Sequence, residues 1–414
     1  MRSAEMTATS DVTIVGGGIV GLATAYALVR GQTTVPGKPR RQPAVTVIDK
    51  EQDWGTHQTA RNSGVIHSGL YYPPGSSKAR FARAGAEAMY EFCAEQGIPA
   101  QRTGKVVVAT SRPHLPRLAE LARRGRANGV RLSEIDGAEL REREPHARGV
   151  KALLVPDAGI TDFAAVARRL AAILQAEGVE LRANTELRGV HRESSSVVLS
   201  TTTGDIRTRR AVNCAGLHSD VVARMAGSIP PARILPFRGE YFHATGSGRD
   251  LVRSLIYPVP NPAFPFLGVH LTRTVDGSVH IGPNAVPALA REGYDWRTWS
   301  AAHLRSLARD RGLRTLARKY WRTGAGEIAR SAFTPMFVRA AQELVPEVRG
   351  RDLHPAGSGV RAQAVTSDGT LVDDFLFTED EHWVHVLNAP SPAATASLLI
   401  GRDIAARASS PWSG

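Results

Sequence analysis

A glycine-rich turn near the start of the chain has the spacing that binds a dinucleotide: Gly16-Gly17-Gly18-Ile19-Val20-Gly21. Gly16 permits the tight turn, Gly18 lets the backbone approach a pyrophosphate, and Gly21 allows the next helix to pack closely on a strand. The N-terminus of that helix offers free N–H groups and the positive end of its dipole to the phosphates. Asp49 can accept hydrogen bonds from the ribose hydroxyls, and its charge disfavours the 2′-phosphate of NADP.

The elements on either side of the turn supply the context that this chemistry needs. The apolar, β-branched run Asp11–Val15 predicts a buried strand, and Leu22–Leu28 has a helical pattern. A second buried strand is predicted over Ala44–Ile48, ending at Asp49. Together they form a βαβ unit whose connector is lengthened between Gly31 and Pro43.

Two further segments favour FAD over NAD as the dinucleotide. Ala211–Gly216 predicts a short strand that ends in a glycine turn able to close over the same cofactor. His57–Tyr72 is rich in small and polar residues that can line a pyrophosphate and a ribityl chain. The predicted cofactor-binding residues are Gly16, Gly18, Ile19, Val20, Gly21, Asp49, Lys50, Thr59, Asn62, Ser63, Gly64, Val65, Val190, Ala215, Gly216, Gly359, Arg361, Ser391, Pro392, Ala393 and Thr395.

Five stretches of the sequence resemble the L-2-hydroxyglutarate dehydrogenase/oxidase family of the D-amino-acid oxidase-like flavoproteins. The resemblance runs over nearly the whole chain and implies a non-covalent FAD, two domains, and oxidation of (S)-2-hydroxyglutarate to 2-oxoglutarate. Electrons would then pass to oxygen or to a quinone. The connector at Gly31–Pro43 departs from the family pattern, at the adenosine end of the cofactor. The five stretches are His57–Tyr72, Pro236–Phe242, Pro265–Arg273, Gly359–Ala364 and Asn388–Thr395.

Oxidation of a 2-hydroxy acid needs a base for the hydroxyl proton, cations for the carboxylates, and a path for the hydride from C2 to flavin N5. His67, in the small-residue loop, and His270, on an apolar strand, are the candidate bases. Arginine suits a carboxylate because its planar fork makes two parallel hydrogen bonds. The alternatives are a packing role for each histidine and a structural ion pair for each arginine. The predicted substrate-binding residues are Arg238, Tyr241, Tyr257 and Arg361.

The order of predicted elements gives an α/β fold with two domains. A Rossmann-like FAD-binding domain is assembled from the discontinuous residues 1–90, 150–228 and 355–414. An α+β substrate domain with an antiparallel sheet takes residues 91–149 and 229–354, where short strands and Pro-rich turns prevail. Asn388–Thr395 leads into a last helix, and the resemblance implies that the N-terminus of this helix points at the flavin.

Charge and composition limit the partners. The 52 Lys and Arg against 39 Asp and Glu give a net charge of +13, but the basic residues are spread along the chain without a nucleic-acid-binding module, so no specific nucleic acid is expected. The charge is compatible with peripheral contact with an anionic membrane. Cys93 and Cys214 lack the spacing of metal ligands, so no metal is predicted. The polar start at Met1–Ser10 and the absence of a long apolar run predict a cytoplasmic protein, or one peripheral on the inner face of the membrane.

The residues alone leave two other functions open. One keeps the fold and changes the substrate to an amine, an amino acid or a larger hydroxy acid. The other is a binding protein that contains a flavin but does not catalyse a redox reaction with it. An oxidase or dehydrogenase acting on a small acidic 2-hydroxy acid remains the leading prediction, because the segments around the flavin carry the residues that such chemistry needs.

Overall fold

The strand that precedes the glycine turn lies at the centre of an eight-stranded sheet in the computed structural model, which describes residues 8–31, 42–260 and 268–410. This strand, β1 (Ala8–Val15), pairs in parallel with β2 (Val45–Ile48) and β12 (Gly204–Asn213), as a Rossmann-like unit requires. The hairpin predicted near residues 197–208 is present as β11 against β12. The sheet is completed by β9 (Glu180–Arg182), β10 (Leu187–Arg192), β11 (Val197–Thr201), β19 (Leu376–Glu379) and β20 (Trp383–Asn388).

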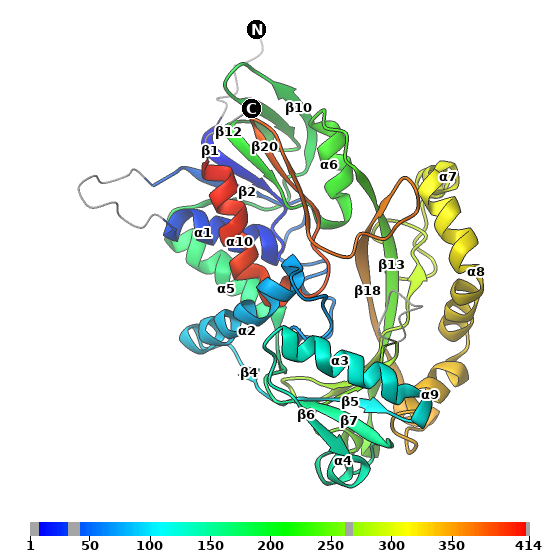
Figure 1. Ribbon diagram of the computed structural model, residues 1–414. Coiled ribbons are helices and arrows are strands. Elements are labelled where there is room, and N and C mark those ends of the chain that lie inside the picture. Colours follow the sequence, from blue (N-terminus) through cyan, green and yellow to red (C-terminus); the bar gives the residue numbers. More distant parts are fainter. Residues whose placement is uncertain (1–7, 32–41, 261–267, 411–414) are drawn as a thin grey trace.

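Helices from three distant parts of the chain cover this sheet (Figure 1). The first and the last, α1 and α10, lie side by side, and a Cβ at Gly401 of α10 would overlap the backbone of Ala23 in α1. Their apolar faces share one core with the strands, which includes Ile14, Leu22 and Ile400. The covering helices are α1 (Ile19–Arg30), α2 (Ser77–Gln96), α5 (Phe163–Ala176), α6 (Ser219–Met225) and α10 (Ala393–Ser409).

A second, mainly antiparallel sheet of nine strands carries the opposite wall of the site. Its long strands β13 and β18 pair over most of their length, which brings Gly239 opposite Gly359. The strands are β5 (Lys105–Ala109), β6 (Ser133–Asp136), β7 (Lys151–Val155), β13 (Ala232–Ala244), β14 (Leu255–Pro258), β15 (His270–Arg273), β16 (Val279–Gly282), β17 (Val286–Pro287) and β18 (Leu353–Thr366).

Two strands fall on the other side of the predicted domain boundaries. Both β7 and β18 lie in the second sheet, although residues 150–228 and 355–414 were predicted to belong to the FAD-binding domain. The reason is pairing: β7 is hydrogen-bonded to β5, and β18 to β13, and such partners cannot be read from local sequence. All eight strands of the first sheet lie within the segments predicted for the FAD-binding domain.

Three helices follow one another along one edge of the molecule, beyond β13 and β18: α7 (Ala301–Arg309), α8 (Arg311–Ala332) and α9 (Thr334–Gln342) (Figure 1). Among the described residues, no helix has the length and apolar character needed to cross a membrane.

Most of the lengthened connector at Gly31–Pro43 lies outside the described residues. The remaining elements are α3 (Leu115–Ala127), α4 (Gly137–Arg143), β3 (Val65–Ile66), β4 (Ala100–Gln101), β8 (Gly159–Thr161) and the short 3₁₀ turns Arg112–His114, Gly216–His218, Gly246–Leu251 and Gly350–Asp352.

Candidate functional site

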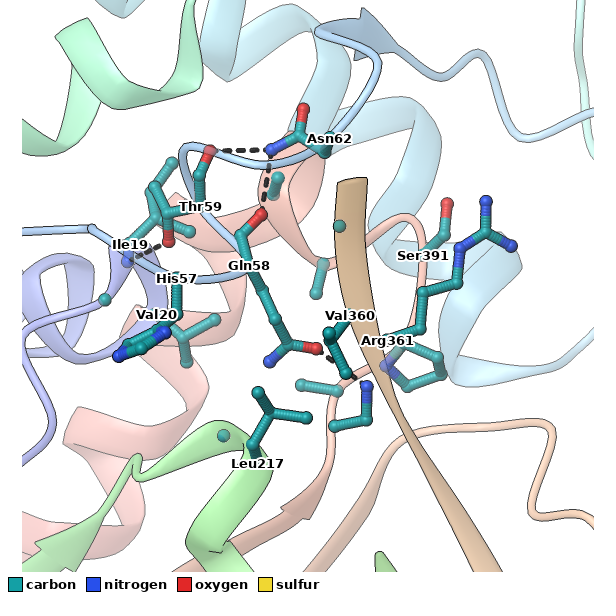
Figure 2. Close-up of a pocket in the computed structure, with 18 of the residues that line it drawn as sticks. Ile19, Val20, His57, Gln58, Thr59, Asn62, Leu217, Val360, Arg361 and Ser391 are labelled. Atoms are coloured by element: carbon teal, nitrogen blue, oxygen red, sulfur yellow. Dashed lines mark hydrogen bonds between the residues drawn. The ribbon is translucent and has the colours of Figure 1, made fainter. Parts of the chain in front are cut away.

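A cavity of about 910 Å³ lies between the two sheets and extends from the carboxyl ends of β1 and β2 to the face of the second sheet. Figure 2 shows Ile19, Thr59 and His57 on one side of it and Arg361 and Ser391 on the other, with the side chain of Gln58 between them. A volume of this size and an elongated outline suit a dinucleotide together with a small substrate.

The glycine turn forms one end of the cavity. Gly16 has φ of 113°, a conformation that favours glycine, and a Cβ there would overlap the carbonyl oxygen of Cys214. A Cβ on Gly18, by contrast, would lie 3.5 Å from Thr59 Oγ1 and would meet no other atom within 4 Å. The backbone at Gly18 is therefore accessible from the cavity. Thr59 Oγ1 also accepts the N–H of Ile19 at 3.0 Å, which caps the first turn of α1.

Asp49 closes the same end, at the carboxyl end of β2. Its carboxylate accepts the backbone N–H of Gly17 at 2.6 Å and that of Glu51 at 2.9 Å. Burial nevertheless raises the pKa of Asp49 above its usual value, although these two hydrogen bonds act to lower it. The carboxylate is therefore fixed in place while it lines the cavity, as an acceptor for ribose hydroxyls must be.

The loop after Asp49 joins the two sheets across the cavity. Gln58 Oε1 accepts the backbone N–H of Ala362 in β18 at 2.9 Å, and a Cβ on Gly359 would overlap the carbonyl oxygen of Arg61. Asn62 holds the loop in shape, because its amide donates to the carbonyl oxygens of Gln58 and Thr59 at 3.0 and 2.6 Å (Figure 2). These contacts hold the loop against β18 and fix its shape.

A charged cluster lies beside this loop. The Lys50 ammonium contacts Glu51, Glu292 Oε2 at 3.1 Å and His57 Nε2 at 3.2 Å. Burial alone would raise the pKa of Glu292, but the hydrogen bonds from His218 and Lys50 and the charge of His57 outweigh it and hold that pKa at about 2. Glu51, His57 and Glu292 have the spacing of metal ligands, yet the lysine already supplies the cation between them.

The far end of the cavity brings the two candidate bases together. The backbone N–H of His67 donates to Thr395 Oγ1 at 3.1 Å, at the start of α10, and His67 Nε2 lies 3.3 Å from Ser391 Oγ. His270 Nδ1 donates to the carbonyl oxygen of Gly268 at 2.9 Å, which leaves Nε2 as an acceptor. Both imidazoles line the cavity.

Burial keeps both imidazoles neutral. It lowers the pKa of His67 well below its usual value, and the positive charge of Lys105 lowers it further. Burial likewise lowers the pKa of His270 to about 3. Tyr241 and Arg361 also line this end, where burial raises the pKa of Tyr241 although the Arg361 guanidinium acts to lower it. The pocket thus combines two neutral proton acceptors with a permanent cation.

The structure places most of the predicted site residues around this one cavity. Gly21 and Gly64 do not line it; a Cβ on either would instead overlap or crowd a backbone carbonyl oxygen, of Gly16 and of Thr161 respectively. The predicted residues that line the cavity are Gly16, Gly18, Ile19, Val20, Asp49, Lys50, Thr59, Asn62, Ser63, Val65, His67, Ala215, Gly216, Tyr241, Tyr257, His270, Gly359, Arg361, Ser391, Pro392, Ala393 and Thr395.

Two predicted residues lie elsewhere. Val190, on β10, packs against the apolar cluster beneath the first sheet, and it is Leu187 on the same strand that lines the cavity. Arg238 is fully buried, but its guanidinium stacks on the ring of Trp296 at 4.1 Å and donates to Glu240 Oε1 at 3.1 Å. Of the two predicted carboxylate clamps, Arg361 alone faces the cavity among the described residues. Neighbours in the tertiary fold, which the local strand pattern does not specify, decide where Arg238 points.

Several lining residues were not predicted, and three of them surround the substrate end. Tyr71 and Tyr72 belong to the predicted loop but were not singled out, and Lys78 follows at the start of α2. Lys78 is buried and paired with Asp373 at 2.9 Å. Lysines at the ends of predicted elements usually reach solvent, so only the adjoining pair of tyrosines offered a signal in the sequence.

Comparison with known proteins agrees with this geometry. Residues 11–407 match the model of the FAD dependent oxidoreductase family. The L-2-hydroxyglutarate dehydrogenase of Indibacter alkaliphilus is 44% identical over 95% of this chain and 97% of that protein. That of Escherichia coli is 41% identical over 96% of this chain and 92% of its own length.

The chain belongs to the L-2-hydroxyglutarate dehydrogenase family of FAD-dependent oxidoreductases.

The fold of this family member is shared with L-α-glycerophosphate oxidase from Mycoplasma pneumoniae, solved with FAD bound. The TM-score is 0.79 at 22% identity, covering 97% of this chain and 94% of that one. Family membership confirms three predictions: an enzyme of the oxidoreductase class, FAD as its cofactor, and an α/β fold with a Rossmann-like FAD-binding sheet.

The residues of this family member also fit FAD physically. The bare backbone at Gly18 and the start of α1 suit a pyrophosphate, and the fixed Asp49 carboxylate suits a ribose. At the other end of the cavity, the start of α10 presents Ala393 and Ala394. The positive end of this helix suits an electron-rich ring system.

Proposed function

We propose that the protein oxidises (S)-2-hydroxyglutarate to 2-oxoglutarate. One observation supports this most strongly: two neutral histidines and an arginine converge at the end of the cavity that is remote from the glycine turn. A 2-hydroxy acid needs a proton acceptor for its hydroxyl and a cation for its carboxylate. The names of the relatives at 41–44% identity agree with this substrate.

The base is assigned to His67. Its backbone is fixed to Thr395, at the start of the helix on the cofactor side, and its Nδ1 is buried without a hydrogen-bond partner among the described residues. His270 is held flat against Tyr257 and presents Nε2. We assign to His67 the transfer of the hydroxyl proton, and to His270 a place beside the hydroxyl at the same end of the cavity.

Arg361 binds the carboxylate next to the reacting carbon. Its guanidinium lines the cavity beside Tyr241, whose hydroxyl stays protonated because burial raises its pKa. Two parallel hydrogen bonds from the guanidinium fix the carboxylate plane and therefore the direction of the C2–H bond. FAD held against Gly18, Asp49 and the start of α10 would supply the acceptor for the hydride that leaves C2.

The electron acceptor is proposed to be a membrane quinone, reached by peripheral contact through the edge formed by α7, α8 and α9 (Figure 1). Trp299 and Phe333 are 64% and 61% exposed there, which is unusual for large apolar side chains. Exposed arginines accompany them, the combination that binds an anionic lipid surface. Among the described side chains, the exposed large apolar residues and arginines of this edge and of the loop before α7 are Trp296, Arg297, Trp299, Leu304, Arg305, Arg309, Arg311, Arg314, Arg318, Phe333, Met336 and Arg339.

A substrate panel tests the proposed reaction. The purified holoenzyme is supplied with a dye as electron acceptor, and the products from both isomers of 2-hydroxyglutarate, longer hydroxy acids, amines and amino acids are identified. Formation of 2-oxoglutarate from the (S) isomer, with little turnover of the others, is expected. Preferential oxidation of an amine or of a longer hydroxy acid would overturn the proposal while leaving the family assignment intact.

A further inference from the structure

Lys105 is a buried lysine that the reaction described above does not use. It opens β5 opposite Leu255 of β14 and Val155 of β7, and it is 1% exposed. Among the described residues, no carboxylate forms an ion pair with it, in contrast to Lys78 with its partner Asp373. Burying an ammonium without a counter-ion costs free energy of folding. A lysine at this position therefore indicates a function that offsets this cost.

The side chain ends between two aromatic rings. Its Nζ lies 4.2 Å from the ring centroid of Tyr257 and 5.0 Å from that of Tyr71. Such cation–π contacts offset part of the cost of burial. Both tyrosines line the cavity, and Tyr257 stacks on His270 with ring centroids 3.9 Å apart. Lys105 therefore lies directly behind the aromatic wall of the substrate end.

Other polar groups at this end also lack partners. The Tyr71 hydroxyl and His67 Nδ1 are buried, and neither has a hydrogen-bond partner among the described residues. Unsatisfied buried groups gathered in one place indicate a ligand that supplies the missing partners. The Tyr71 hydroxyl, which can donate, and the Lys105 amine match a ligand with a second set of acceptor oxygens, besides those held by Arg361.

We propose that Lys105 makes this cavity selective for a doubly negative substrate. It becomes protonated when the second carboxylate enters, and its charge then holds that carboxylate across the Tyr71 and Tyr257 rings. This inference rests on the proposed function and assigns to Lys105 a role in specificity, without a part in the chemistry.

Lys105 is the group expected to take up a proton when the ligand binds. Burial lowers the pKa of Lys105 to about 7, so at pH 8 roughly a tenth of the molecules carry the charge before binding. The groups that face Lys105 do not titrate there: burial holds the pKa of His67 and of His270 far below 8, and raises the pKa of Tyr71 and of Tyr257 far above it.

Calorimetric titration of the oxidised holoenzyme at pH 8 tests the inference. Glutarate, a dicarboxylate without a hydroxyl to oxidise, and pentanoate, a monocarboxylate of the same length, are each titrated in two buffers of different ionisation enthalpy. Glutarate is expected to bind more tightly and with uptake of nearly one proton; pentanoate is expected to bind without proton uptake.

Three variants test whether Lys105 is the group that takes up the proton. In Lys105→Met, glutarate affinity should fall about tenfold or more and proton uptake should vanish, with pentanoate affinity unchanged. Lys105→Arg should keep the preference for glutarate and lose the uptake, because arginine is already charged. Lys151→Met, which removes a half-exposed charge from the neighbouring strand β7, should behave like the wild type.

Three results would overturn the inference: failure of glutarate to bind the wild type more tightly than pentanoate, proton uptake that persists in Lys105→Met, or uptake that persists in Lys105→Arg. The last result decides the matter if Lys105→Met does not retain FAD. Failure of the proposed function looks different, because the wild type would then discriminate between glutarate and pentanoate but would not be reduced by (S)-2-hydroxyglutarate.

Discussion

The ring of Tyr257 stacks on the imidazole of His270, with centroids 3.9 Å apart and planes inclined by 21°. The stacking and the hydrogen bond from His270 Nδ1 to the Gly268 carbonyl oxygen fix one tautomer and one orientation. The free Nε2 is thereby presented to the cavity. His67 follows β3, a strand of a small three-stranded sheet with β4 and β8, and lines the same cavity. The two imidazoles therefore flank the position proposed for the substrate hydroxyl.

Replacing the proposed base should slow reduction of the flavin. We expect His67→Ala to lower the rate constant about 10²- to 10⁴-fold, the usual contribution of a positioned base, and His270→Ala to lower it less. Anaerobic stopped-flow measurements give this rate without interference from reoxidation. Ser391→Ala, which removes the hydroxyl near His67 Nε2, serves as a milder control. Wild-type rates in His67→Ala would refute the assignment.

The rate should not fall in mild acid. Because burial holds the pKa of His67 well below its usual value and that of His270 at about 3, both imidazoles remain unprotonated as the pH drops from 7 to 5. We therefore expect kcat/KM not to decline over that range, whereas a histidine with its ordinary pKa near 6.5 would cause a decline. A decline with an apparent pKa near 6.5 would show that the base is solvated.

The two arginines once predicted as clamps should differ in their effects. Arg361→Met should raise KM about tenfold or more, because a charged hydrogen-bonding partner of the carboxylate is lost. Arg238→Met should leave KM within about twofold and lower the melting temperature, since Arg238 contacts Trp296 and Glu240. Steady-state kinetics and thermal unfolding of both variants check this. A large KM effect in Arg238→Met would contradict its placement.

Retention of FAD should depend on the close approach at Gly21. A Cβ there would overlap the Gly16 carbonyl oxygen, so Gly21→Ala must displace the turn or the helix, at a cost of about 1–3 kcal/mol. The ratio of flavin to protein absorbance after purification should fall. Gly324→Ala, in helix α8 with open space around it, is the matched control and should keep its flavin. Equal flavin content in the two variants would argue against the proposed role of Gly21.

Binding to vesicles should depend on the exposed edge of α7 to α9. Trp299→Ala should weaken sedimentation with anionic vesicles about tenfold, and added salt should weaken it in the wild type as well. Ile229→Ala is the control, because Ile229 is 96% exposed but lies outside this edge. If both variants bind as the wild type does, the membrane contact lies elsewhere.

Local patterns were enough to predict the nucleotide-binding end of the cavity. The turn from Gly16 to Gly21 and the strand ending at Asp49 form a contiguous βαβ unit, in which spacing along the chain fixes spacing in the fold. The family resemblance added the distant segments around His67 and Arg361, which lie in the same cavity. These parts were predictable because the chemistry restricts the residue types at each position.

Features set by tertiary contacts were not predictable in the same way. Lys105 is buried because β14 and β7 flank its strand and the Tyr71 and Tyr257 rings cover its ammonium, none of which is local in sequence. Arg238 turns away from the cavity because Trp296, far along the chain, offers it a stacking surface. Pairing between distant strands likewise moved β7 and β18 across the predicted boundary.

An anaerobic titration of the purified holoenzyme shows whether (S)-2-hydroxyglutarate reduces the bound flavin. Addition of one equivalent of the (S) isomer should bleach the visible flavin absorbance and release one equivalent of 2-oxoglutarate, with no change on adding the (R) isomer. Flavin that stays oxidised with the (S) isomer, but is reduced by dithionite, would refute the proposed oxidation of (S)-2-hydroxyglutarate.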